Sequence, residues 1–214
     1  MRIVRILPIA LIVLLSGPAF SEDWMTYSDQ SQFFSVNFPA EPDVQEISYA
    51  SEYGASFPAR VYTVQNGRNF YSVTVVNFTN ARNIYLELPD KTDEASASGL
   101  WLYDQRASTA YAARNFRLRG GEITYDAWHH IDLVEGHQLQ ITNPDQSRTY
   151  AGIYLHDSRL YVLEATVPAD ALPQGLFQQS LSFLDENGNR IRYELRPDGS
   201  RTRLSRLPGA PATP

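Results

Sequence analysis

Hydrophobic and polar residues alternate with a period of two through much of the chain, which predicts β-strands. Phe34, Val36 and Phe38 alternate with polar neighbours, and similar runs flank Asn66-Gly67. An Asn-Gly pair between two β-branched and aromatic runs predicts a β-hairpin, because both residues tolerate positive φ. The strands that we expect cover residues 24–27, 33–38, 44–49, 60–64, 70–78, 122–133, 137–141, 149–156 and 160–167.

In two segments the apolar residues recur at steps of three and four, which predicts helices with one apolar face. The first helix is expected to begin near Asp93 or Ser98, either of which can serve as the N-cap, and to end at Arg114. The second is expected over residues 174–184. Strands, a helix, more strands and a helix in this order predict an α+β fold with a central antiparallel β-sheet and helices packed on it.

The start of the chain has the pattern of an export signal. Arg2 and Arg5 precede an apolar run over residues 6–15, which is shorter than the roughly twenty residues needed to span a membrane. Small residues follow the run, so we expect a signal peptide over residues 1–21 that is cut after Ser21. An uncleaved membrane anchor is the alternative, and the short run disfavours it.

The rest of the chain is expected to form a single domain over residues 22–195 and a disordered tail, rich in Arg and Pro, over residues 196–214. The chain has no cysteine, although a secreted eukaryotic domain of this size usually carries disulfides. We therefore expect a bacterial periplasmic or secreted protein with no transmembrane span after signal cleavage.

Net charge argues against a nucleic-acid partner. Removal of Arg2 and Arg5 with the signal leaves 18 − 2 = 16 basic residues against 24 acidic ones, a net charge of 16 − 24 = −8. An acidic domain repels phosphate backbones and anionic lipid headgroups.

Both ends of the expected domain resemble a known group of proteins. Trp24-x-x-Tyr27 with residues 34–42, and the closing segment 176–188, resemble the corresponding segments of uncharacterised exported proteins of Gram-negative bacteria. Those proteins are similar at fold level to the PsbP-like α/β/α sandwich. The resemblance implies helices on both faces of a central antiparallel sheet and a non-enzymatic binding or assembly role, and no binding residue is carried over from it.

Familiar catalytic motifs are missing from the chain. It contains no Gly-x-Ser-x-Gly, Walker A, His-Glu-x-x-His or Ser-x-x-Lys sequence, and without cysteine it has no thiol nucleophile. We therefore expect no cofactor and lean against an enzyme. Glu135 and Glu164 are the carboxylates considered for acid–base chemistry, and a solvated sheet face is the favoured position for Glu164.

His129, His130, Asp132 and His137 form the densest group of metal-binding residue types. Neighbours on a strand point to opposite faces, so His130 and Asp132 are expected to share a face with Trp128, and His129 to point away. A zinc site needs three or four converging ligands, and only two are local here. Polar residues on a sheet edge are therefore the favoured interpretation over a metal site.

Tyrosine is the strongest functional hint, with 13 residues in the chain. Tyr150 and Tyr154 are expected on one strand face, opposite Ile153. Tyrosine is favoured at contact surfaces, and its high strand propensity is the equal alternative. We interpret Tyr150, Tyr154, His130 and Trp128 as the candidate partner-binding face.

These observations favour an exported periplasmic, non-enzymatic binding or assembly module with an unidentified envelope protein as its partner. A small-ligand or metal-binding periplasmic protein is the second hypothesis. An enzyme with an unfamiliar site is the third.

Overall fold

The computed structural model describes residues 24–88 and 99–204. The strands in these ranges form antiparallel sheets of seven, three and two strands. The signal peptide expected over residues 1–21 and the last part of the expected tail, residues 205–214, lie outside the described residues. Within the described ranges, no helix is both long enough and apolar enough to cross a membrane.

The seven-stranded sheet forms the centre of the molecule, with the order β3-β4-β5-β9-β8-β7-β6. All its neighbouring strands are antiparallel, which confirms the predicted sheet and the predicted meander after the long helix. The β4–β5 loop consists of Gly67 and Arg68, because Asn66 already pairs with Asn69. The strands are β3 (Asp43–Ala50), β4 (Ser56–Asn66), β5 (Asn69–Asn77), β6 (Glu122–Ile131), β7 (Val134–Thr142), β8 (Arg148–His156) and β9 (Arg159–Val167).

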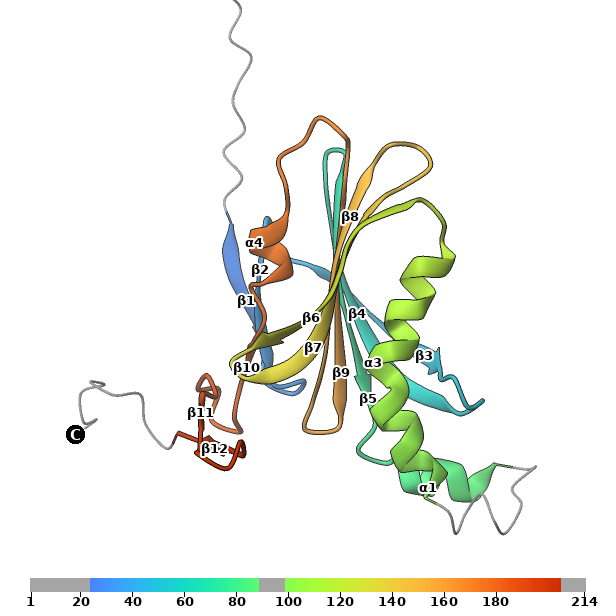
Figure 1. The fold of residues 1–214 in the computed structure, drawn as a ribbon, viewed down its shortest axis with the longest axis vertical. Helices are drawn as coiled ribbons and strands as arrows, with labels where there is room; N and C mark the ends of the chain where they lie inside the picture. The colour runs from blue at the N-terminus through green and yellow to red at the C-terminus, as the bar shows by residue number, and fades with distance from the viewer. Residues whose placement is uncertain (1–23, 89–98, 205–214) are drawn as a thin grey trace, which may run out of the picture.

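Different layers cover the two faces of this sheet, which Figure 1 shows nearly edge-on. Helices α1 (Ala81–Glu87) and α3 (Leu100–Leu118) lie on one face, which we call the helix side. The other face is covered by α4 (Gly175–Gln178) and a small sheet with the order β1-β2-β10. The small sheet consists of β1 (Met25–Asp29), β2 (Phe34–Phe38) and β10 (Ser182–Phe183). The α+β class is therefore right, but strands rather than a long helix cover the second face.

Alternation along the strands divides the buried side chains into two cores. The core under the small sheet is strongly aromatic, and the rings of Phe34 and Tyr62 meet edge to face at 5.0 Å. The helix-side core contains more alanine beside its aromatic residues, and α3 supplies Ala112, Ala113 and Phe116 to it. Burial of apolar surface contributes about 25 cal/mol per Å² to the stability of a fold. Both cores therefore hold their covering layers against the central sheet.

Helix α3 confirms a helix in this part of the chain, although its ends differ from the prediction and the face that it buries includes the polar residues Asp104, Ser108 and Thr109. The residue at its N-cap is Gly99, and the expected caps Asp93 and Ser98 lie outside the described residues. The helix continues past Arg114 to Leu118. Helix α1 was not predicted, because it is only seven residues long and too short to show a periodic pattern.

The helix predicted over residues 174–184 is wrong beyond its first turn. Only Gly175–Gln178 is helical, and Ser182 and Phe183 pair instead with Ser35 and Phe34 of β2. Phe183 is fully buried in the aromatic core. A short apolar run is equally compatible with a strand, and pairing with β2 buries its apolar side chains while satisfying its backbone.

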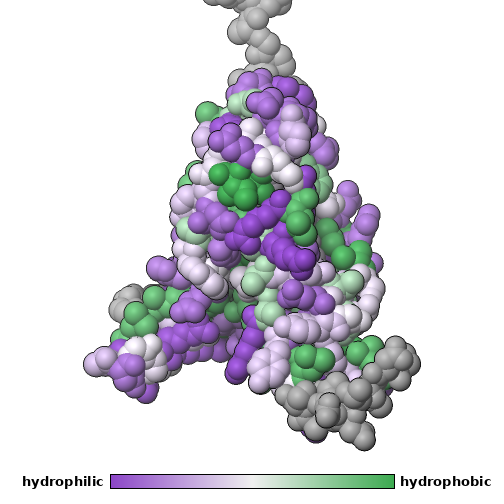
Figure 2. Space-filling view, turned by 45° about the vertical axis from the view of Figure 1, so that its right-hand side comes forward, coloured by the Kyte–Doolittle hydropathy of each residue, from purple (hydrophilic) through white to green (hydrophobic). Residues whose placement is uncertain are grey.

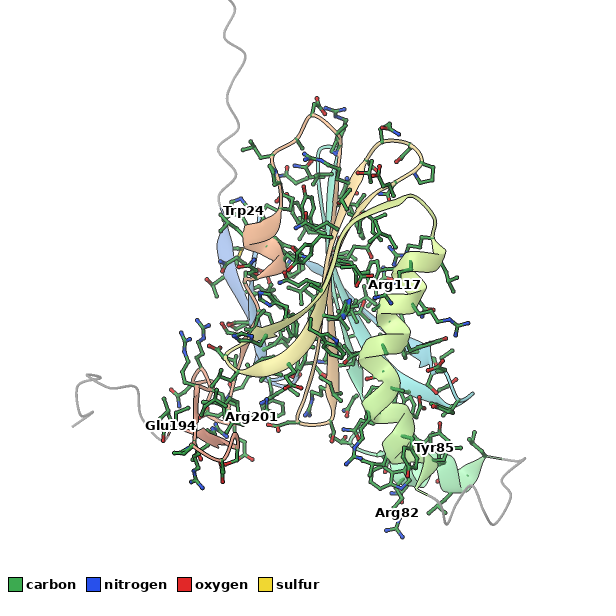
Figure 3. All side chains as sticks on the ribbon, in the orientation of Figure 1. Trp24, Arg82, Tyr85, Arg117, Glu194 and Arg201 are labelled. Carbon is green, nitrogen blue, oxygen red and sulfur yellow. The ribbon has the colours of Figure 1, made fainter. Side chains whose placement is uncertain are left out.

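The tail expected to be disordered from residue 196 is ordered as far as residue 204. Strands β11 (Tyr193–Leu195) and β12 (Arg201–Arg203) form a hairpin, on which Figure 3 labels Glu194 and Arg201. Arg201 donates a hydrogen bond to the carbonyl of Leu133 at 2.8 Å in the β6–β7 turn. The prediction failed because polar contacts, rather than the apolar burial it considered, hold this hairpin in place.

Asp132 anchors the segment that leads into this hairpin, and its replacement by asparagine is expected to destabilise the fold. Its carboxylate is 4% exposed and forms ion pairs with both Arg190 and Arg192. Asparagine keeps the left-handed backbone at this position (φ 51) but removes the charge. We expect Asp132→Asn to lower the free energy of unfolding by about 1–3 kcal/mol in urea titrations.

Asp170→Asn is the matched control, since Asp170 forms an exposed ion pair with Arg68. Its effect on the free energy of unfolding is expected to be much smaller than that of Asp132→Asn, because solvent screens an exposed ion pair. Equal effects of the two substitutions would contradict an anchoring role for Asp132.

Candidate functional site

Strand β6 is one edge of the seven-stranded sheet and pairs with β7 alone among the described strands. An edge strand presents backbone N–H and C=O groups that can pair with another chain. The register of β6 shifts at Thr124 and is regular from Tyr125 to Ile131. Because side chains alternate, Asp126, Trp128 and His130 all point to the helix side.

Trp128 is the most conspicuous side chain of this edge, with 73% of its surface exposed. Tryptophan is highly buried on average, and here Ile123 and Tyr125 of the same strand are exposed as well. The Trp128 ring meets His137 of β7 edge to face, at 5.5 Å and 71°. Figure 2 shows the molecule with the helix side turned forward, where hydrophobic groups lie directly beside hydrophilic ones.

A charged network lies beside Trp128. Arg117 of α3 donates two hydrogen bonds to Asp126, from Nε to Oδ2 at 2.7 Å and from Nη2 to Oδ1 at 2.8 Å, and Figure 3 labels this arginine. His137 Nε2 contacts Asp126 Oδ1 and lies 3.1 Å from Arg117 Nη2. These hydrogen bonds, that from Arg117 above all, lower the pKa of Asp126 to about 2. The network joins α3 to the edge and fixes the imidazole that Trp128 contacts.

A shallow hollow of about 350 Å³ adjoins this network and is lined by Trp128, His129, His130 and Glu135. The two histidine rings stack at 5.8 Å. His129 Nδ1 lies 3.1 Å from the hydroxyl of Tyr154, and burial, followed by the nearby His130, lowers the pKa of His129. The hollow thus combines an exposed aromatic ring with hydrogen-bonding groups, a combination suited to contact with a polypeptide.

The geometry does not assemble a metal site from the predicted residues. Asp132 lies in the β6–β7 turn with positive φ, rather than on the strand, and its carboxylate binds Arg190 and Arg192. The expectation that Asp132 shares a strand face with His130 is therefore wrong. In residues 24–88 and 99–204, no group of three or more His, Cys, Asp or Glu side chains could hold a metal ion.

The predicted partner-binding face combines residues from opposite sides of the sheet. Tyr150 and Tyr154 do share a face, but they are 4% and 0% exposed and lie in the aromatic core under the small sheet. Trp128 and His130 lie on the other side and are exposed. The prediction is wrong for the two tyrosines, because strand alternation does not reveal that α4 and the rest of the layer under the small sheet cover their face.

A second hollow lies between α3 and the sheet, where Arg119 binds Glu164 at 2.5 Å. Its volume is about 190 Å³, below the roughly 300 Å³ at which small-molecule pockets begin. The Glu164 side chain is 16% exposed, so its position is less solvated than we expected. Glu135 lines the hollow at β6 instead, so the two carboxylates do not line the same hollow.

The sequence did not single out Arg117 and Asp126. Asp126 can be recognised only once the β6–β7 turn is placed, because that turn sets which residues of β7 lie beside Asp126 and Trp128. With Asp132 and Leu133 as the turn, His137 falls opposite Trp128. The helical spacing of α3 alone does not indicate which strand Arg117 will meet.

Comparison with known proteins finds matches among solved structures. No protein-family model and no curated protein matches the chain. The solution structure of cyanobacterial PsbP (CyanoP) from Synechocystis sp. PCC 6803 matches it with a TM-score of 0.45 and 14% identity, over 78% of this chain and 96% of that chain. This is a weak resemblance in overall fold, and it says nothing about what this chain binds.

Asp126 gives the site a pH-dependent contribution to stability. The pKa of Asp126 in the fold, about 2, is below the ordinary value of 3.8. The ionised carboxylate therefore stabilises the fold at pH values above 3.8, and this contribution disappears as the pH falls toward 2. Its side chain is 29% exposed, so solvent screening reduces the contribution to about 1 kcal/mol. We expect urea titrations to show a difference of this size between wild type and Asp126→Asn at neutral pH, shrinking below pH about 4. A difference independent of pH would contradict this account.

Replacement of Tyr154 by phenylalanine tests whether the Tyr154 hydroxyl stabilises the core. Gln138 is buried and donates a hydrogen bond to this hydroxyl at 3.1 Å. Tyr154→Phe leaves that amide without its partner, so we expect a loss of about 1–2 kcal/mol in the free energy of unfolding, measured with urea. The exposed Tyr103 of α3 is the control, for which the change to phenylalanine is expected to cost less than about 0.5 kcal/mol. Equal costs at the two positions would contradict the assignment.

Proposed function

We propose that this protein is an exported, non-enzymatic binding or assembly module that binds a protein partner by adding a strand of that partner to the edge of β6. The observation that carries the proposal is Trp128, which is 73% exposed on a strand whose outer edge pairs with no other strand in residues 24–88 and 99–204. A partner strand would gain main-chain hydrogen bonds along β6 and an aromatic contact at its centre.

The surroundings of Trp128 suit a binding role. Tryptophan is enriched among the few residues that carry most of the energy of an interface. Arg117 and Asp126 hold His137 in place, and His137 supports the Trp128 ring from one side. A side chain held in this way loses less conformational entropy when a partner covers it.

The opposite edge of the sheet is less suited to this role. Strand β3 also exposes apolar residues, Val44 and Ile47, but Glu46 lies between them and forms an ion pair with Arg60. Exposed charged side chains on an edge strand oppose pairing with another chain. The Glu46 side chain is 78% exposed, whereas that of Asp126 on β6 is 29% exposed and is held by Arg117 of α3. The aromatic residue of β3, Tyr49, packs against the helix-side core. The β3 edge therefore serves as the control surface for β6.

Localisation in this proposal rests on the sequence alone. The basic, apolar and small residues of segment 1–21 support export to the periplasm or beyond, and the lack of cysteine supports a bacterial source. The resemblance of residues 34–42 and 176–188 to exported proteins of Gram-negative bacteria points the same way. An envelope protein is therefore the expected class of partner.

Site-specific photo-crosslinking in the source cells tests the proposal. A photoreactive phenylalanine analogue is placed at Tyr125 on β6 or, as control, at Ile47 on β3, both of which are exposed. We expect a protein adduct from position 125 that disappears when Trp128 is also changed to alanine, and no adduct from position 47. Mass spectrometry of the adduct must map the attachment to an extended segment of the crosslinked polypeptide.

Absence of an adduct at position 125, or an adduct that is indifferent to Trp128→Ala, would contradict the proposal. The folded state of Trp128→Ala is checked by urea titration. Its stability is expected to stay within about 0.5 kcal/mol of wild type, because an exposed side chain contributes little to the fold.

A further inference from the structure

We infer that the strand accepted by β6 is β6 of a second copy of this chain, so that two seven-stranded sheets join edge to edge. This inference rests on the proposed function, because it names the partner of the same edge. Its basis is the self-complementarity of the regular part of β6, from Tyr125 to Ile131. The two-fold axis of such a dimer passes between the two copies of Trp128.

Alternation restricts how two identical strands can pair. In an antiparallel pair, residues directly opposite each other lie on the same face of the joined sheet. Asp126, Trp128 and His130 share one face of β6, and Tyr125, Ala127, His129 and Ile131 share the other. The axis must therefore pass through a residue position, rather than between two positions.

The register centred on Trp128 matches complementary groups. It places each Trp128 opposite the other, and each Asp126 opposite His130 of the partner copy. An imidazole N–H can donate to a carboxylate whether or not the ring is charged, and paired aromatic rings are favourable on adjacent strands. On the other face, Tyr125 lies opposite Ile131 and Ala127 opposite His129, so no like charges face each other.

Neighbouring registers are less favourable. Centring the pair on Asp126 sets two carboxylates directly opposite each other, and like charges in that position destabilise a sheet. Centring it on Ala127 places Asp126 opposite Trp128, which leaves the carboxylate facing an aromatic ring. The irregularity at Thr124 ends the regular strand on one side and the turn at Asp132 ends it on the other. Trp128 is the midpoint of the seven residues from Tyr125 to Ile131.

Disulfide trapping tests both the dimer and its register, because the chain has no cysteine of its own. Protein purified from cells that express the full chain carries either Ala127→Cys or His129→Cys, and the two are mixed under mild oxidation. Positions directly opposite each other on paired strands lie within the range in which a disulfide forms. We expect a linked species that contains one copy of each variant, exceeding the dimer formed by Ala127→Cys alone.

Sedimentation equilibrium of cysteine-free protein measures the dimer without a crosslink. We expect Trp128→Glu to weaken self-association at least about tenfold, which corresponds to 1.4 kcal/mol, because it replaces the ring pair with two facing carboxylates. Val44→Glu on the exposed part of β3 is the matched control, and it is expected to leave association unchanged. Urea titration confirms that both variants fold.

The outcomes separate this inference from the function on which it rests. A monomer at all concentrations, with no mixed disulfide, overturns the second copy as partner. If position 125 still crosslinks to a different protein, the strand-accepting function stands and only the identity of the partner is wrong. If position 125 crosslinks to nothing, both proposals fail. A disulfide dimer of Ala127→Cys alone that equals the mixed species contradicts the register.

Discussion

The inner strands of the seven-stranded sheet are largely buried on both faces, whereas the edge strands β3 and β6 are mostly exposed, and this constraint decides what the rest of the molecule can do. Aromatic side chains of the sheet fill one core, and tyrosines suit its boundary because the ring is buried while the hydroxyl reaches a polar partner. Tyr62 donates to Asp29 at 2.6 Å, and Tyr161 donates to the carbonyl of Gln32 at 2.9 Å. The high tyrosine content is thus largely explained by the interior rather than by a binding surface. Because each inner strand already pairs with a neighbour on both sides, the sheet can accept a further strand only at β3 and β6.

The two edges are built differently. β3 carries an ion-paired glutamate between its exposed apolar residues, which is a common protection against pairing. β6 instead exposes Trp128, and α3 reaches across to hold the neighbouring imidazole through Arg117 and Asp126. Support of this kind stiffens an exposed ring without covering it. The open edge and the supported ring together favour the acceptance of a further strand.

Local pattern predicted most of the central sheet, because alternation and turn residues act over a few positions. It placed the β4–β5 hairpin and the meander from β6 to β9, and it found α3. It failed where long-range packing decides, as at Ser182 and Phe183, which join β2 rather than extend a helix. The same limit explains the error at Tyr150 and Tyr154, since the layer that covers them comes from both ends of the domain. Of the candidate face, Trp128 and His130 remain exposed, and Arg117 is supplied by a helix that no local pattern connects to them.

Hydrogen–deuterium exchange of the β6 amides across a protein concentration series tests the central claim most directly. The account predicts that amides on the outer side of β6, between Tyr125 and Ile131, exchange more slowly as concentration rises, while those of β3 do not change. Protection arises because pairing with a second β6 occupies N–H groups that otherwise face solvent. Exchange in β6 that is fast and independent of concentration would contradict the pairing of two copies through this edge.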